Sequence, residues 1–369
     1  MKRKALSLLL VLFVLLAMVH TVKANEPIVW TAINEGLEEL TIGNMAIDPI
    51  ETDTLYAATY SKGVFKTING GESWLAINTG LTNLEARAIA IDPETPARLY
   101  LGTYEGGLFK SENGGESWAA MISPLNGKAV LQIVINPQTP STLYVLALDE
   151  GVYKSTDGGQ TWALKSANLP PGLVHLSLAI DPLTPETLYL GAMGFSLLKS
   201  INGGDTWVPS NTGLGVHAAM SIAIDPEEPS TLYAGTMSGG VYKSEDSGAT
   251  WTSASAMLNG KSIRSLAIDA KKTNTLYAGS DSSGVYMSLD AGATWQDINN
   301  GLEANANITT ILIEPKNSAN LYIGTIDYGA FKAKLEVVDP DPDPDPDPDP
   351  DPDPEAFVIN FPIVLRDEK

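Results

Sequence analysis

The sequence contains no cysteine in its 369 residues and only three histidines, His20, His175 and His217. The lack of cysteine excludes disulfide bonds, thiolate metal sites and cysteine nucleophiles. So few histidines do not suit a histidine-rich metal centre, and no phosphate loop or nucleophile elbow is present. We therefore expect no metal, no cofactor and no assigned catalytic residue. Basic residues are also scarce, since 23 Lys and Arg stand against 44 Asp and Glu and give a net charge of −21. Such an acidic chain disfavours a nucleic-acid partner.

Charged residues make up only 18% of the chain, while glycine (33) and proline (24) are frequent, which favours short strands and turns over helices. The N-terminus has a basic segment, Lys2 to Lys4, an apolar run from Ala5 to Val19, and small residues before a cleavage point after Ala24. This pattern predicts a secretory signal peptide over residues 1–24. An uncleaved anchor is the alternative, but the run is short for a membrane span, so we expect a secreted or extracytoplasmic protein without a stable span.

The C-terminal part is of a different composition. Residues 339–354 repeat Asp-Pro eight times, which predicts an extended acidic linker with a reach of roughly 50 Å. Weak calcium binding by this linker is a less favoured alternative. Residues 355–369 form a short, largely apolar tail that resembles the C-terminal tails of many secreted bacterial proteins. We expect either attachment to the cell surface through this tail or a loosely docked strand.

Between the leader and the linker, one unit of about 44 residues recurs. All seven tryptophans lie in this register, at Trp30, Trp74, Trp118, Trp162, Trp207, Trp251 and Trp295. A Leu-Tyr pair recurs with them, at Tyr56, Tyr100, Tyr144, Tyr189, Tyr233, Tyr277 and Tyr322. An Ile-Asp-Pro corner or its equivalent also recurs, at Asp48, Asp92, Asn136, Asp181, Asp225, Asp269 and Glu314. Three series in one register indicate a repeat architecture.

Each unit contains four short strands separated by turn signals. In the second unit the alternation puts Ile89 and Ile91 on one face of the first strand and Ala88 and Ala90 on the other. The pattern predicts an all-β protein, a seven-bladed β-propeller with four-stranded antiparallel blades over residues 25–338. The seventh unit lacks a tryptophan strand, and the segment around Trp30 would supply it. Deletion of residues 25–34 should therefore open the ring and lower the melting temperature.

The third and fourth strands are joined by Ser/Thr-x-Asp/Asn-x-Gly-x-Ser/Thr-Trp, from Thr67 to Trp74 in the first unit and from Ser155 to Trp162 in the third. This motif resembles the Asp-box, or BNR, repeat of sialidases, sortilin-type receptors, oligoxyloglucan-type glycosidases and photosystem II assembly factors. The resemblance covers Trp30 to Lys334. It implies that the box is a folding element away from the ligand face, so that Asp157, Asp246 and Asp290 are neither catalytic nor metal-binding.

The loops between the second and third strands differ from unit to unit, and propeller geometry places them on the face opposite the Asp boxes. Variable loops on a constant scaffold are common binding sites. The candidate ligand-binding residues on this face are Tyr60, Tyr104, Glu105, Asp149, Glu150, Phe195, Asp281 and Tyr328, with Arg87 and Arg264. The two arginines occupy equivalent positions in units two and six and could hold an anion across the channel mouth. The alternative is that both are ordinary solvated arginines.

These residues favour a non-enzymatic binding or scaffold protein whose partner is a protein or a polysaccharide outside the cytoplasm. The alternative is a glycoside hydrolase that uses carboxylates of the variable face, since such enzymes need two carboxylates about 5–10 Å apart. A third hypothesis is an assembly factor for a membrane complex, although the basic patch of the photosystem factors is not evident. Sialidase activity is not expected. Sialidases need an arginine triad for the substrate carboxylate, and the propeller contains in all only Arg87, Arg98 and Arg264.

Overall fold

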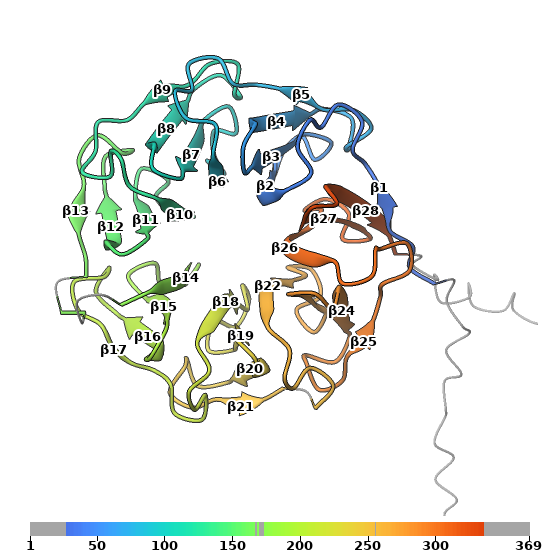
Figure 1. Cartoon of the computed structure of the whole chain (residues 1–369). Helices are drawn as coiled ribbons and strands as arrows, with labels where there is room; N and C mark the ends of the chain where they lie inside the picture. The colour runs from blue at the N-terminus through green and yellow to red at the C-terminus, as the bar shows by residue number, and fades with distance from the viewer. Residues whose placement is uncertain (1–26, 167, 170–172, 255, 336–369) are drawn as a thin grey trace, which may run out of the picture. The chain divides into compact units, whose positions relative to one another are not determined.

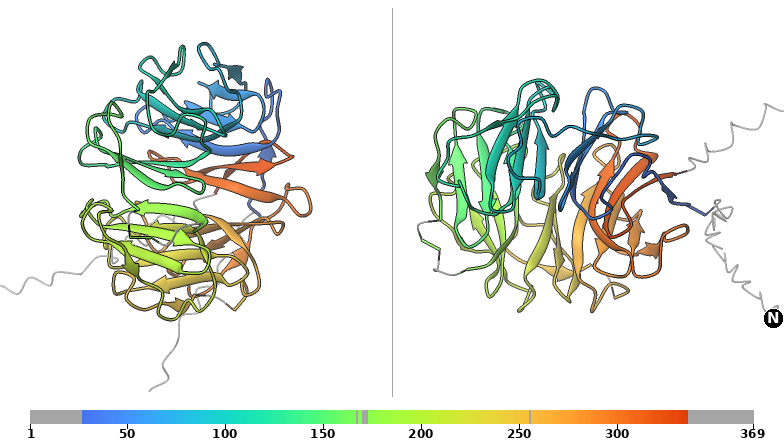
Figure 2. Two further views of the ribbon diagram at one scale, coloured as in Figure 1. Left: turned by 60° about the vertical axis from the view of Figure 1, so that its left-hand side comes forward. Right: turned by 45° about the horizontal axis from the view of Figure 1, so that its top comes forward.

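A computed structural model describes residues 27–335, except for residues 167, 170–172 and 255. The expected signal peptide, Asp-Pro linker and C-terminal tail lie outside the described residues. The described part forms one compact unit, Pro27–Leu335, in which 28 strands make seven antiparallel sheets of four strands each. The sheets are arranged as blades around a central axis (Figure 1 and Figure 2). The prediction of an all-β, seven-bladed propeller is confirmed.

Equivalent strands of the blades occupy equivalent positions in the ring (Figure 1). The inner strands are β2 (Ile42–Ile47), β6 (Ala86–Ile91), β10 (Val130–Ile135), β14 (His175–Ile180), β18 (Ala219–Ile224), β22 (Ile263–Ile268) and β26 (Asn307–Ile313). The second strands are β3 (Leu55–Thr59), β7 (Leu99–Thr103), β11 (Leu143–Ala147), β15 (Leu188–Ala192), β19 (Leu232–Thr236), β23 (Leu276–Ser280) and β27 (Asn320–Ile326). The third strands are β4 (Gly63–Thr67), β8 (Gly107–Ser111), β12 (Gly151–Ser155), β16 (Ser196–Ser200), β20 (Gly240–Ser244), β24 (Val285–Ser288) and β28 (Ala330–Lys334). The outer strands are β5 (Leu75–Ala76), β9 (Ala119–Ala120), β13 (Ala163–Leu164), β17 (Val208–Pro209), β21 (Thr252–Ser253), β25 (Gln296–Asp297) and β1 (Thr31–Ala32).

The first strand of the chain closes the ring. β1 pairs antiparallel with β28, with Thr31 opposite Lys332, and thereby completes the seventh blade. Trp30 beside it is 2% exposed, and its indole Nε1 donates a hydrogen bond to the carbonyl of Ile298 in blade six at 2.6 Å. The predicted closure of the last blade by the N-terminal strand is therefore confirmed.

The hydrophobic core is divided among the junctions between blades. Ile89 and Ile91 of β6 pack with Tyr56 of the first blade, whereas Ala88 and Ala90 pack toward the third blade. The predicted alternation of large and small side chains on the inner strand is thus present. Because each junction buries the large face of one blade against its neighbour, the ring is stabilised by burial of apolar area at every junction.

The Asp boxes are turns whose polar groups bond to one another. In the third blade, Asp157 Oδ1 accepts hydrogen bonds from the amides of Gln160 and Thr161, both at 2.9 Å, and from the hydroxyl of Ser155. The hydroxyl of Thr161 donates to Asp157 Oδ2. These bonds to the ionised carboxyl lower the pKa of Asp157 to about 2. Both carboxylate oxygens therefore have partners inside the turn.

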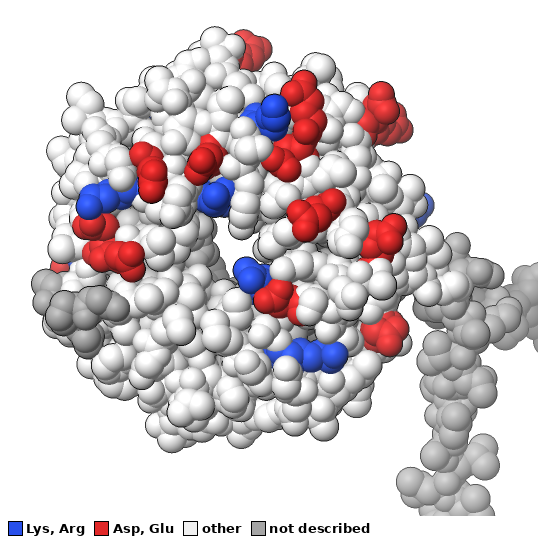
Figure 3. Space-filling model, in the orientation of Figure 1, with Lys and Arg blue, Asp and Glu red and all other residues white. Residues whose placement is uncertain are grey.

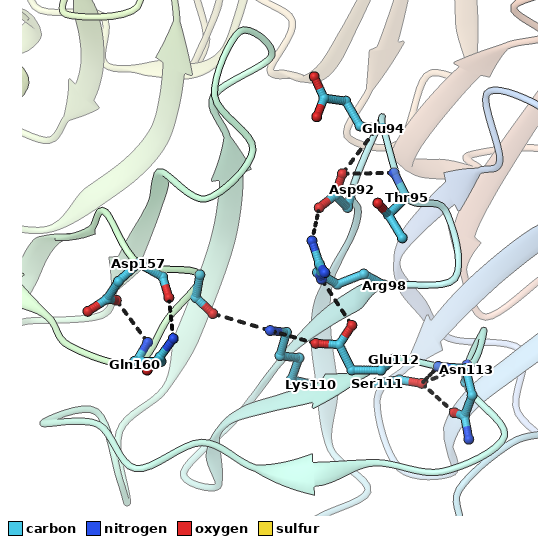
Figure 4. A network of polar contacts seen from close by, with 12 residues as sticks. Asp92, Glu94, Thr95, Arg98, Lys110, Ser111, Glu112, Asn113, Asp157 and Gln160 are labelled. Carbon is cyan, nitrogen blue, oxygen red and sulfur yellow. Dashed lines mark hydrogen bonds and ion pairs between the residues drawn. The ribbon is translucent and has the colours of Figure 1, made fainter.

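In each of the first six blades the Asp box also lies against the corner between the first two strands of the same blade. Figure 4 shows this for the second blade, where Arg98 forms ion pairs with Asp92 of the corner at 2.8 Å and with Glu112 of the box at 3.0 Å. Lys110 pairs with the same Glu112 at 2.8 Å. Asp92 accepts backbone amide bonds within the corner, so corner and box form one polar network.

Consequently the propeller has two different faces. We call the one formed by the corners and the boxes the Asp-box face. The other, which we call the variable face, is formed by the turns between second and third strands and by the connections between blades. Hydrogen bonds such as that from the amide of Tyr104 to the carbonyl of Glu85, at 2.8 Å, join turn to connection there. The described chain ends at Leu335, whose amide bonds to Ala319 in the corner of the seventh blade, and thus on the Asp-box face.

Candidate functional site

The turns of the variable face share one backbone conformation. The second turn residue is left-handed in six of the seven blades, and a residue other than glycine adopts it in five: Glu105 (φ 61°), Asp149 (59°), Ser238 (62°), Ser282 (69°) and Asp327 (73°). Blade four has Gly194 there, with φ 83°. Glycine is the residue that this conformation favours, and others adopt it at an energetic cost. Five blades therefore retain a polar side chain where glycine would be less strained.

Three predicted residues come together at the junction of the first two blades. The guanidinium of Arg87, at the start of β6, lies 3.7 Å from the ring centroid of Tyr60 and 5.2 Å from that of Tyr104. Its Nη1 donates to the carbonyl of Tyr60 at 3.4 Å, and Glu85 is the nearest carboxylate at 4.0 Å. The arginine side chain is 19% exposed. Cation–π contacts on two sides hold it in place and link the turns of both blades.

The second predicted arginine has different partners. Arg264 Nη2 lies 3.2 Å from Asp281 Oδ2, and Asn307 of β26 donates to Asp281 Oδ1. Asp281 is therefore held by one residue of its own blade and one of the next. The structure places each arginine in a separate cluster, and a shared anion between Arg87 and Arg264 stays a prediction.

A third cluster lies at the junction of blades three and four. Lys128 forms an ion pair with Glu150, while Asp149 beside it is exposed. His175, at the start of β14, is only 4% exposed, and neither ring nitrogen has a hydrogen-bond partner. Burial lowers the pKa of His175, and the nearby carboxylate of Asp149 opposes this shift. His175 is not among the residues predicted from the sequence to bind a ligand. Its position on the inner strand is equivalent to that of Val130 in the preceding blade. A histidine at a position where the preceding repeat has an apolar residue was the signal by which the sequence could have indicated it.

Two other predicted residues, Phe195 and Tyr328, accept hydrogen bonds through their backbone carbonyls. Asn211 donates to the carbonyl of Phe195 at 2.9 Å, and Asn34 donates to that of Tyr328 at 3.0 Å. The same Asn34 accepts a hydrogen bond from the amide of Ala330 at 2.8 Å. Sequence reasoning missed these asparagines, although an Asn two residues before a Gly recurs at the start of several connections, at Asn34, Asn78, Asn211 and Asn299. Hydrogen bonds between these asparagine side chains and the backbone hold the turns in place.

The described residues contain no group of three or more His, Asp or Glu side chains arranged to hold a metal ion. Within the same residues no helix has the length and apolarity of a membrane span. Two carboxylates of the variable face, Glu150 and Asp281, are paired with cations. Glu105 and Asp149, in the turns of adjacent blades, have no hydrogen-bond or ion-pair partner among the described residues. The face thus offers side chains for binding, with its paired carboxylates already engaged.

Family models match parts of the repeat region. The model described as sortilin, neurotensin receptor 3, matches residues 195–306 and 239–332, and the model of the BNR/Asp-box repeat matches residues 153–164. No curated protein matches the chain in a sequence search.

Solved structures of similar fold include GH74 enzymes and YCF48 proteins. The GH74 xyloglucanase from Xanthomonas campestris aligns with a TM-score of 0.69 at 18% identity, over 84% of this chain but only 54% of its own. YCF48 bound to D1 peptide aligns with a TM-score of 0.65 at 16% identity, over 85% of this chain and 98% of its own. YCF48 from Cyanidioschyzon merolae aligns with a TM-score of 0.65 at 16% identity, over 83% of this chain and 99% of its own. The chain therefore spans about half of the xyloglucanase and nearly all of YCF48. The repeats, the fold and these matches identify the chain as a β-propeller of the BNR, or Asp-box, type.

Proposed function

We propose that this protein is an exported, non-enzymatic binding module whose variable face recognises a protein or a polysaccharide outside the cytoplasm. The observation that carries the proposal is the left-handed turn position, where Glu105, Asp149, Ser238, Ser282 and Asp327 replace the favoured glycine. Strained backbone of this kind is concentrated at functional sites in proteins. Here it displays a polar side chain from five blades on one face.

The extent of the structural matches supports binding over hydrolysis. The GH74 xyloglucanase has about twice the length that this chain covers, whereas YCF48, solved with a D1 peptide, is covered almost completely. In addition, Glu150 and Asp281 are held in ion pairs, which would have to break before either carboxyl could serve as a general acid. One observation favours a glycoside hydrolase as the second candidate. Glu105 and Asp149, which lack polar partners, lie in the turns of adjacent blades.

The exit of the chain is consistent with a displayed module. The last described residue, Leu335, lies on the Asp-box face. The described end of the chain therefore leaves the turns of the variable face free for a ligand.

The test uses the full chain on a panel of polysaccharides and secreted proteins, with binding and release of reducing sugar measured together. We expect binding without sugar release. The double variant Glu105→Gln, Asp149→Asn should weaken binding, whereas the matched Asp157→Asn on the Asp-box face should not. Sugar release that the double variant abolishes would establish the hydrolase instead. Binding that is insensitive to the double variant would contradict the assignment of the variable face.

A further inference from the structure

Charge is distributed very unevenly over the variable face. The turns and connections of blades four and five contain no Asp, Glu, Lys or Arg over residues 193–195, 210–218, 237–239 and 256–260. Figure 3 shows the consequence, since the described surface over β14–β21 is white while red and blue side chains surround the rest of the opening. The turns and connections of the other blades carry the acids Glu38, Glu39, Glu85, Glu105, Asp149, Glu150, Asp281, Glu303 and Asp327.

The uncharged part presents apolar side chains to solvent. Val216 is 90% exposed and Met193 is 45% exposed, while Phe195 and Met237 are half-buried beside them. We call these four residues, with His217, the apolar sector. Methionine adapts to differently shaped apolar partners, and adjacent exposed apolar residues often mark an interaction surface.

Hydrogen bonds join the members of the apolar sector into one surface. Ser196 Oγ donates to the carbonyl of Gly215, next to Val216, at 2.9 Å. The amide of Met237 bonds to the carbonyl of Ala218 at 2.9 Å, and His217 Nδ1 lies 3.2 Å from the carbonyl of Met237. The turn of blade four, the following connection and the turn of blade five are thus fixed side by side. Their apolar side chains form a preorganised surface, and its ordering costs a ligand little free energy.

The neighbours of the apolar sector determine which ligand fits it. Blade three flanks it with Asp149, whose carboxylate has no ion-pair partner among the described residues, and with Glu150, which is paired with Lys128. On the blade-six side Asp281 is paired with Arg264, and Lys261, whose carbonyl accepts a hydrogen bond from the amide of Gly240, lies beside the turn of blade five. An apolar segment that also carried carboxylates would be repelled by these turns and by the net charge of −21. A segment with Lys or Arg beside its apolar residues would meet opposite charge at the edge that Asp149 forms.

We propose that the apolar sector binds an extended polypeptide segment in which large apolar side chains stand next to Lys or Arg. The apolar side chains contact Met193, Phe195 and Val216, and the cations lie near Asp149 of blade three. The inference rests on the proposed function and narrows its partner to a basic, apolar segment of a protein.

The test uses the full chain and two synthetic peptides of about twelve residues, with the same Leu, Phe and Met half followed by either lysines or glutamates. Fluorescence anisotropy should show binding of the lysine peptide, weaker in high salt, and none of the glutamate peptide. Val216→Asp should weaken binding at least about tenfold. The matched Ile201→Asp should leave it unchanged, because Ile201 is 71% exposed in the same blade but on the Asp-box face.

Two outcomes would overturn the inference: no binding of the lysine peptide, or equal loss of binding in the Val216 and Ile201 variants. Circular dichroism of both variants confirms that each is folded. The proposed function and this inference are contradicted by different results. If ligands from the panel still depend on Glu105 and Asp149 while the lysine peptide does not bind, the variable face is a binding face and only the class of partner is wrong.

Discussion

The substitution Trp30→Ala is a direct test of how the ring is closed. Trp30 is 2% exposed, its indole bonds to Ile298 and its amide bonds to Asn300 at 2.8 Å. Removal of a buried tryptophan costs about 3–5 kcal/mol through lost transfer free energy and the cavity that remains. With an unfolding entropy of about 2.1 cal/mol/K per residue over about 310 residues, this loss lowers the melting temperature by roughly 5–8 °C. Deletion of residues 25–34 should lower it further, since β1 and Asn34 are lost together.

Calorimetry measures the shift, and hydrogen exchange of the β28 amides reports whether the edge opens. Trp162→Ala is the matched control, because Trp162 occupies the same repeat position but is half-buried, and its indole bonds to Gly159 of its own box at 3.0 Å. We expect a smaller shift there and no change in exchange at β28. The reasoning is refuted if the two variants shift the melting temperature equally or if β28 stays protected in Trp30→Ala.

Three further predictions concern single side chains. Burial lowers the pKa of His175 below its usual value of 6.5, so the unfolded chain binds the extra proton first and the wild type loses stability as the pH falls below about 6.5. The variant His175→Val has the residue that Val130 provides in the preceding blade. It should show a smaller fall in melting temperature between pH 7.5 and 5.5 than the wild type. Asp157→Ala should lower the melting temperature while Asp157→Asn should not, since asparagine occupies this box position in three other blades. The contribution of the ionised Asp157 carboxyl to stability should disappear as the pH falls from about 4 toward its pKa of about 2. Gly63→Ala should destabilise the first blade, measured by urea denaturation, because Gly63 has a φ of 79° and an added Cβ would lie 2.2 Å from Asn78 Oδ1.

The blades could be predicted from the sequence because every repeat states the same pattern. The tryptophan spacing, the Asp box and the alternation of Ile89 with Ala88 are local signals, and each junction uses them in the same way. Closure by Trp30 followed from counting strands, since one outer strand had no blade and one blade had no outer strand. The family resemblance added the role of the box, which the bonds around Asp157 bear out.

The side-chain clusters could not be predicted to the same degree, because their members are distant in sequence and differ from blade to blade. Arg87 meets Tyr60 of the preceding blade, 27 positions away, and no pattern within one repeat states that contact. Asp281 is engaged by Arg264 of its own blade and Asn307 of the next. The repeat predicts where such positions lie, but the identity of the neighbour depends on two different blades at once.

The separation of the two faces explains how one scaffold can vary its ligand without losing its fold. On the Asp-box face, the same interactions recur with little change, as in the bond from the amide of Gly115 to Ser111 Oγ and that from the amide of Gly204 to Ser200 Oγ, both at 2.9 Å. On the variable face, a constant backbone carries a different side chain in each blade, and exposed substitutions away from packed features change stability little. Binding should therefore respond to Val216 and stability to Trp30, and a variant that altered both would show that the faces are coupled.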